Sequence, residues 1–248
     1  MNYAWNWGVF LQKTPDGSAT YLDWLISGLG WTVSVALSAW VLALVLGAVL
    51  GVMRTVPDKW LSGIATAYVE IFRNIPLLVQ LFVWYFVVPE LLPFGLGNKI
   101  KQMDPTVNAF LTSFLCLGLF TAARVCEQVR AGINSLPKGQ KNAGLAMGLT
   151  LWQTYKFVLL PMAFRIVIPP LGSEFMNIFK NSSVALTIGL LELTAQSRQI
   201  AEYTANTFEA FIAATVLYLC ITLTAVTIMR WLEHHFRVPG YITGGGGK

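Results

Sequence analysis

The sequence has few charged residues and only two histidines. Of its 248 residues, 12% are Asp, Glu, Lys or Arg and 55% are hydrophobic, whereas an ordinary soluble domain has about 25% charged residues. A chain with so few charges cannot cover itself with a solvated surface. This excludes a soluble globular domain and predicts an integral membrane protein.

The residue patterns of enzymes, metal sites and nucleic-acid binding are missing as well. Three cysteines lie in or at the ends of apolar segments, without the paired short spacings of zinc sites, and we interpret them as packing residues: Cys116, Cys126 and Cys220. His234 and His235 do not have the HExxH spacing. The net charge of +5 comes from short segments between apolar runs and not from a basic patch with stacking aromatics. We therefore expect no catalytic residue, no metal, no cofactor in this chain and no nucleic-acid partner.

Five apolar segments are long enough to cross a bilayer, which takes about 20 residues in a helix. The predicted spans are approximately 25–53, 64–88, 105–127, 166–190 and 209–231. The second and fourth contain Pro76 and the pair Pro169 and Pro170, which either bend the helix where a path opens or form static kinks. Gly47 and Gly51 have GxxxG spacing, which we interpret as close packing inside this chain.

The basic residues predict the orientation, because Lys and Arg near span ends are retained in the cytoplasm. One set of loops contains Arg54, Lys59, Arg124, Arg130, Lys138, Lys141, Lys156, Arg165, Arg230, Arg237 and Lys248, and the opposite set contains only Lys13, Lys99, Lys101 and Arg198. We therefore expect the N-terminus outside and the C-terminus in the cytoplasm. The whole chain, 1–248, is expected to form a single transmembrane domain.

The cytoplasmic segment from about 128 to 162 is too long for a simple turn, since helix connections in bundles take roughly two to eight residues. Glu127 to Ser135 can continue the third span, Lys138-Gly139-Gln140 turns the chain, and Lys141 to Met147 has the pattern of a short amphipathic helix that Gly148 ends. Such a helix either inserts into a groove of a partner or lies on lipid.

This segment resembles the cytoplasmic loop of the ABC importer permeases, which reads Glu-Ala-Ala, three residues, Gly, nine residues, Ile-x-Leu-Pro. The chain has Asn142-Ala143-Gly144, then Gly148, then Val158-Leu159-Leu160-Pro161 at the same spacing. Asn142 replaces the glutamate, which removes any salt bridge made by that glutamate, and Gly144 replaces the second alanine.

Further motifs are similar to those of the polar amino-acid branch of this family. They are Glu70-Ile71-Phe72-Arg73-Asn74-Ile75-Pro76-Leu77-Leu78-Val79-Gln80, Leu136-Pro137-Lys138-Gly139-Gln140 and Phe179-Lys180-Asn181-Ser182-Ser183. Trp5-Asn6-Trp7-Gly8 and the run from Thr121 to Gln128 look most similar to the glutamate/aspartate import permeases. Together the motifs cover nearly the whole chain.

The resemblance implies an α-helical permease subunit of five to six spans in the bacterial inner membrane. It also implies a second permease chain or a copy of this one, two ATP-binding subunits that hold Mg-ATP, and an extracytoplasmic solute-binding protein. Contact with the ATP-binding subunit is expected at Lys141, Asn142, Ala143, Gly144, Leu145, Met147 and Gly148, and the loop motif ends at Leu160 and Pro161. In this reading the chain is not an enzyme and carries polar amino acids by alternating access.

Polar residues inside spans normally face water or the interior of a bundle, because lipid does not solvate them. Two helical stripes are predicted, one through Arg73, Leu77, Gln80 and Trp84 and one through Ser173, Asn177 and Lys180. The candidate substrate path therefore comprises Glu70, Arg73, Asn74, Gln80, Glu174, Asn177, Lys180 and Asn181. Alternatively, these charges only pair with each other, Arg73 with Glu70 and Lys180 with Glu174 or a neighbouring loop.

Other functions remain open at this point. Import of another amino acid, such as glutamine or a basic amino acid, is compatible with the same motifs. A secondary transporter or channel would also carry charges inside its spans, but it has no reason to present the spacing from Asn142 to Pro161.

Overall fold

The computed structural model describes residues 3–93 and 95–236. In these two ranges the regular structure is helical, and the β pairing is limited to an isolated bridge between Lys13 and Thr20. The helices, in chain order, are η1 (Trp7–Leu11), α1 (Tyr21–Met53), α2 (Lys59–Asn74), α3 (Leu77–Phe82), η2 (Val83–Val87), α4 (Val88–Leu91), α5 (Leu96–Lys101), α6 (Pro105–Asn134), α7 (Lys138–Ala146), α8 (Leu151–Thr154), η3 (Tyr155–Leu159), α9 (Leu160–Asn181), η4 (Ser182–Ile188), α10 (Leu193–Thr204) and α11 (Thr207–Phe236).

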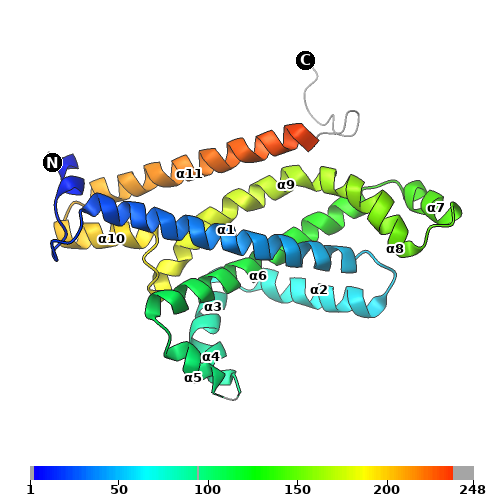
Figure 1. Cartoon of the computed structure of the whole chain (residues 1–248), viewed down its shortest axis with the longest axis horizontal. Coiled ribbons are helices and arrows are strands. Elements are labelled where there is room, and N and C mark those ends of the chain that lie inside the picture. Colours follow the sequence, from blue (N-terminus) through cyan, green and yellow to red (C-terminus); the bar gives the residue numbers. More distant parts are fainter. Residues whose placement is uncertain (1–2, 94, 237–248) are drawn as a thin grey trace.

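Long apolar helices run roughly side by side along the length of the molecule (Figure 1). Four helical stretches among the described residues are long and apolar enough to cross a membrane: Tyr21–Met53, Pro105–Asn134, Leu151–Ile188 and Thr207–Phe236. A fifth is formed if the bent pair Lys59–Asn74 and Leu77–Leu91 is counted as one span. The prediction of an α-helical chain with about five candidate spans is confirmed at this level.

Close packing of α1 against α6 forms the centre of the bundle. A Cβ atom at Gly47 would lie 2.7 Å from the Ala122 carbonyl oxygen, and one at Gly51 would lie 2.6 Å from the Val129 Cβ. Any larger side chain would therefore push the two helices apart. The GxxxG pair packs inside the chain, as predicted.

The second predicted span is not one straight helix. It breaks at Ile75 and Pro76, and the two parts are bent by 104°. Pro76 has no N–H to continue the helix, and it biases Ile75 towards extended backbone, here with φ −100° and ψ 129°. The prediction that Arg73, Leu77, Gln80 and Trp84 share one helical face is therefore wrong.

The fourth predicted span, 166–190, falls almost entirely within the helical stretch Leu151–Ile188, whereas the loop before it differs from the prediction. α9 ends at Asn181, and the chain continues as the 3₁₀ helix η4 to Ile188, where Gly189 turns it with a φ of 87°. The Lys138-Gly139-Gln140 segment forms the first turn of α7 and does not precede the helix, because the helix begins directly after Pro137. Proline is well suited to the start of a helix, where its missing N–H removes no helix hydrogen bond.

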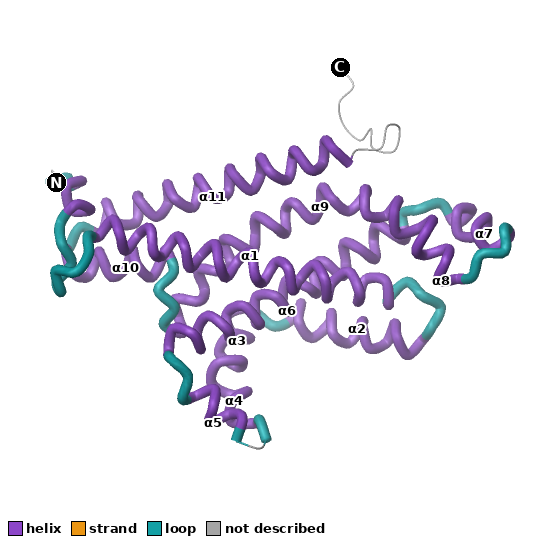
Figure 2. The backbone as a smooth tube through the Cα atoms, viewed as in Figure 1, coloured by secondary structure: helices purple, strands orange, loops and turns teal. Residues whose placement is uncertain are grey.

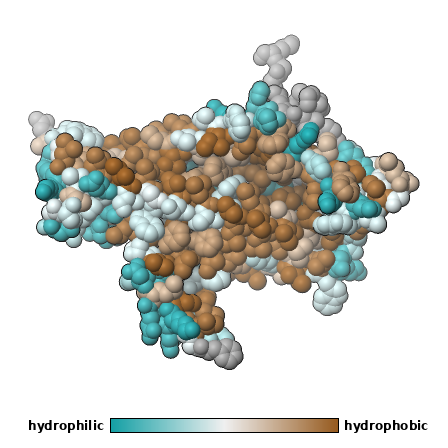
Figure 3. Space-filling model, viewed as in Figure 1, coloured by the Kyte–Doolittle hydropathy of each residue, from teal (hydrophilic) through white to brown (hydrophobic). Residues whose placement is uncertain are grey.

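Loops gather at the two ends of the bundle and in a branch formed by α3 to α5 that leaves the bundle sideways (Figure 2). We refer to the end that carries α10 and the N-terminal segment as the α10 end, and to the opposite one as the α7 end. The visible flank of the bundle between the ends is mostly hydrophobic, and hydrophilic residues concentrate at the ends and on the branch (Figure 3). This distribution is what a membrane-embedded bundle requires.

Candidate substrate path and coupling helix

Glu127 of α6 joins helices through three arginines. Arg54, directly after α1, donates a hydrogen bond to its Oε1, and Arg130 donates from Nε and Nη2 to its Oε2 at 3.1 and 2.9 Å. Arg73 of α2 places Nη1 3.9 Å from the same carboxylate. We call Arg54, Arg73, Glu127 and Arg130 the Glu127 cluster. Its carboxylate ties α1, α2 and α6 together, and the cluster as a whole keeps an excess of positive charge.

A second ion pair joins α6 to α9. Nη1 of Arg124 lies 3.8 Å from Oε1 of Glu174, and its guanidinium lies over the Phe120 ring at 5.0 Å from the centroid. The Glu174 side chain is 11% exposed, whereas that of Arg124 is 42% exposed. The acid is therefore held inside the bundle and the arginine reaches its surface.

The candidate residues of α2 divide into surface groups and one buried amide. Glu70, Arg73 and Asn74 are exposed, and the Asn74 amide donates to the Glu70 carbonyl and carboxylate at 2.8 and 3.0 Å. The ion pair of Arg73 is with Glu127 and not with Glu70, so the pairing left open by the sequence does not form. Gln80 is buried and donates from Nε2 to the carbonyls of Phe72 and Ile75, both at 2.8 Å. It satisfies carbonyls left free by the helix break, which gives it a structural role at the bend.

The candidate residues of α9 follow the predicted stripe. Ser173 and Lys180 are exposed and Asn177 is partly exposed, so they line one outward face of the helix. Asn181 at the end of α9 is partly exposed, while Glu174 is turned inward to Arg124. In the part of the chain that the structure describes, Lys180 makes no ion pair, and the alternative of a Lys180–Glu174 pair does not occur.

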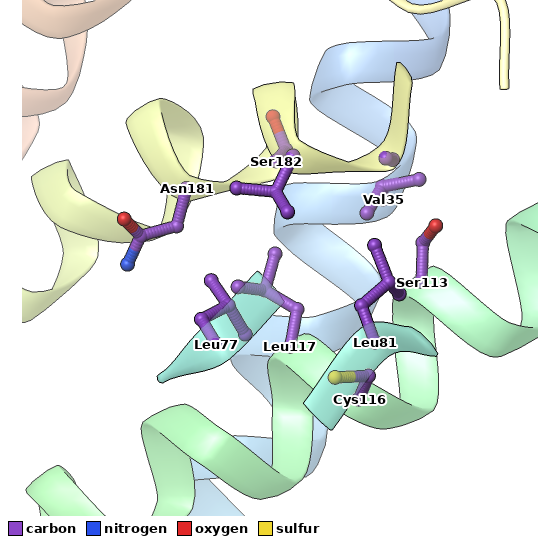
Figure 4. Close-up of a pocket in the computed structure, with 10 residues that line it drawn as sticks. Val35, Leu77, Leu81, Ser113, Cys116, Leu117, Asn181 and Ser182 are labelled. Atoms are coloured by element: carbon purple, nitrogen blue, oxygen red, sulfur yellow. The ribbon is translucent and has the colours of Figure 1, made fainter. Parts of the chain in front are cut away.

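Among the described residues, most of these candidates lie at the surface and not around a cavity. A small cavity of about 10 Å³ lies between α1, α3, α6 and η4, and its walls are mainly apolar, with Val35, Leu81 and Leu117 among them. Asn181 lies at its edge and its amide points away from the other labelled side chains (Figure 4). Glu70, Arg73, Asn74 and Lys180 instead lie on the outer surface of α2 and α9, where a second molecule has to cover them if they are to form a path.

The α7 helix stands at one end of the bundle with an exposed tip (Figure 1). Gly148 has a φ of 83°, its N–H donates to the Leu145 carbonyl, and the Leu149 N–H donates to the Gly144 carbonyl at 3.1 Å. This is a Schellman ending, which favours glycine at that position. Asn142, Ala143, Leu145 and Met147 are exposed and Lys141 is partly exposed. The surface around the helix end is thus available to a partner.

Gly144 has a role that the sequence did not reveal. It is buried, and a Cβ atom there would lie 2.9 Å from Thr154 Cγ2 and 3.1 Å from Thr154 Oγ1 on α8. Glycine at this place lets α7 approach α8 closely. Leu160 and Pro161 begin α9 directly after the π-helical turn η3, so the end of the loop motif is continuous with a candidate span.

Sequence reasoning missed several embedded polar residues. Of the acids it placed only Glu70 and Glu174 on the candidate path, and it counted Arg54, Arg124 and Arg130 with the loops. The fully buried Glu192 was also missed: it accepts hydrogen bonds from the N–H groups of Thr194 and Ala195 and from the Tyr218 hydroxyl. Burial raises the pKa of Glu192, and the donated hydrogen bonds act against that rise. The available signal was an acid directly before a helix, where the helix dipole favours a negative charge.

Comparison with known proteins gives relatives over the whole chain. The chain is 52% identical to the glutamate/aspartate import permease protein GltJ of Escherichia coli O6:H1 (strain CFT073), over 98% of this chain and 100% of that protein. It is 30% identical to the glutamate/aspartate import permease protein GltK of the same strain, over 93% of this chain and 98% of that protein.

A solved structure described as an amino acid ABC transporter with histidines has a similar fold. The TM-score is 0.74 at 29% sequence identity, and the match covers 87% of this chain and 95% of that one. Residues 43–238 match the family described as the inner membrane component of binding-protein-dependent transport systems. The chain belongs to this family of inner membrane transport components.

Proposed function

We propose that this chain is a permease subunit of an ATP-driven importer for glutamate and aspartate. The observation that carries the proposal is the 52% identity to GltJ over the full length of that protein. The excess of positive charge in the Glu127 cluster, together with Arg124 and Lys180 on the same set of helices, fits an anionic substrate.

The substrate path lies between this chain and a second permease subunit. Glu70, Arg73, Asn74 and Lys180 are exposed although they belong to the predicted spans, and lipid is a poor neighbour for them. A second subunit over this face turns it into a water-filled path, with Asn177, Asn181 and Glu174 further along α9. GltJ and GltK are two different permease proteins of one strain, which favours a related but different second chain here.

ATP binds and reacts in two separate subunits, each of which grips one permease. In this chain the contact is the exposed surface of α7 from Lys141 to Gly148, and it lies in the cytoplasm, with the α10 end outside. A solute-binding protein delivers the amino acid at the α10 end. ATP changes the arrangement of the helices only if it binds one arrangement more tightly than the other, so α7 has to transmit force as a rigid element.

The test is uptake by the reconstituted complex. The chain is purified with its second permease, its ATP-binding subunits and its binding protein, and uptake of radiolabelled glutamate into proteoliposomes is measured. We expect saturable uptake that requires Mg-ATP and is competed by aspartate. Preferential uptake of glutamine or a basic amino acid would show that the substrate is not glutamate or aspartate. Uptake driven by an ion gradient without ATP would show that the protein is a secondary transporter.

A further inference from the structure

Arg124 is a cation on a tightly packed part of α6. Ala122, Ala123, Val125 and Cys126 around it are fully buried, whereas the Arg124 side chain is 42% exposed. A charged group inside a span normally faces water or a partner that neutralises it. The surface that Arg124 reaches is therefore one that water, or a group dissolved in it, can also reach.

The hydrogen-bond donors of Arg124 are largely unused, whereas two other arginines of the bundle use theirs. Arg54 and Arg130 both donate hydrogen bonds to Glu127. Arg124 is 3.8 Å from the Glu174 carboxylate, which is beyond hydrogen-bond distance, and it donates no hydrogen bond within the described part of the chain. Its charge is balanced by Glu174, but its guanidinium donors remain available.

The surroundings hold the guanidinium in place. The Phe120 ring lies 5.0 Å below it, and Glu174 is fixed at its side by burial within the bundle. A planar guanidinium presents parallel N–H groups that match the two oxygens of a carboxylate. A substrate carboxylate that reaches this surface can therefore form the hydrogen bonds that Glu174 leaves unmade.

Arg73 and Lys180 are less suited to this task. Arg73 lies 3.9 Å from a carboxylate that two other arginines already bind, and Lys180 makes no ion pair within the described chain and carries a flexible ammonium group. They add positive potential to the face, while Arg124 alone combines an exposed guanidinium, an aromatic support and a single buried counter-ion.

We infer that Arg124 binds a carboxylate of the amino-acid substrate during its passage and that Glu174 is the internal carboxylate with which the substrate competes. The inference rests on the proposed function, because it requires an anionic amino acid in the path. In this role Arg124 selects negatively charged amino acids within the membrane part of the importer.

The test compares variants of the complete reconstituted complex, with glutamate uptake at saturating binding protein as the readout. We expect Arg124→Gln to lower the uptake rate roughly tenfold or more, because charge-assisted hydrogen bonds are lost, and Arg124→Lys to lower it less. Glu174→Gln should raise the uptake rate, because it removes the competitor. The double variant Arg124→Gln/Glu174→Gln should be as slow as Arg124→Gln. Lys101→Gln, in an exposed pair with Glu90 on the branch, is the matched control and should behave as the wild type.

A purely structural ion pair gives a different pattern. In that case Arg124→Gln and Glu174→Gln each slow uptake, and the double variant recovers because neither charge is left alone. That recovery, or normal uptake by Arg124→Gln, would overturn the inference. Absence of ATP-driven glutamate uptake by the wild-type complex would instead refute the proposed function itself, so the two failures are distinguishable. Assembly and basal ATP hydrolysis of each variant show that it has folded.

Discussion

At the scale of single residues, the charged groups around Glu127 differ in how firmly they are held. Glu127 receives hydrogen bonds from Arg54 and Arg130 and so stabilises the contact between α1 and α6. Arg73 is within ion-pair distance of the same carboxylate, but its side chain is 52% exposed and it donates no hydrogen bond to it. Removing the acid and removing the exposed arginine should therefore have different consequences.

We expect Glu127→Gln to lower the stability of the complex by about 2–3 kcal/mol, because Arg54 and Arg130 lose a charged acceptor at a partly buried site.

Arg73→Gln should instead lower glutamate uptake while thermal stability, assembly and basal ATP hydrolysis change little. Thermal unfolding in detergent and uptake into proteoliposomes measure the two effects. Glu202→Gln, which breaks an exposed pair, is the control and should change stability by less than about 1 kcal/mol. Unchanged uptake in Arg73→Gln would remove Arg73 from the path.

At the scale of helices, the sequence predicted the places of the long elements better than their internal breaks. Long uncharged runs identify α1, α6 and α11 because lipid imposes a minimum length on a span. The 104° bend between α2 and α3 could not be derived from Pro76 alone, since proline is compatible with a mild kink as well as with a full break. Hydrogen bonds from the Gln80 amide to the carbonyls of Phe72 and Ile75 stabilise the break. The spacing of residues along the sequence does not reveal them.

In the candidate site, too, one part could be predicted from the sequence and another could not. The α9 stripe of Ser173, Asn177 and Lys180 was predictable because it lies on one continuous helix, where a spacing of three or four residues fixes the face. The ion pairs of Glu127 and Glu174 were not, because their partners come from different helices and depend on how those helices pack.

The end of α7 offers a direct test of coupling. Valine at Gly148 has to adopt a φ near 83°, which costs about 1–2 kcal/mol for a side chain with a Cβ atom. We expect Gly148→Val to unwind the last turn of α7, so that ATP hydrolysis by the assembled complex continues while glutamate uptake falls. Gly139→Ala in the same helix is the matched control, because a Cβ there meets no atom within 4 Å and alanine favours the helix. Full ATP-dependent uptake by Gly148→Val would contradict the docking of the ATP-binding subunit at α7.

At the scale of the whole molecule, the apolar flank and the exposed polar face of α2 and α9 need different surroundings. The flank visible in Figure 3 is mostly hydrophobic and can face lipid. Glu70, Arg73 and Lys180 need water or protein beside them, and the chain alone does not enclose them. In the proposed importer, a second subunit therefore has to cover this face.

The orientation of that assembly can be measured with two single cysteines at opposite ends of the bundle. Trp60, at the start of α2 beside the α7 end, is 85% exposed, and Leu11, beside the α10 end, is 74% exposed. In a background where the exposed Cys220 is replaced by serine, Leu11→Cys should react with a membrane-impermeant thiol reagent in spheroplasts with an intact inner membrane, and Trp60→Cys only after that membrane is opened. This expectation follows from the excess of Lys and Arg in the loops of the α7 end, because basic loops are retained in the cytoplasm. The reverse labelling pattern would place α7 outside, where no ATP-binding subunit can reach it, and would refute both the orientation and the coupling role.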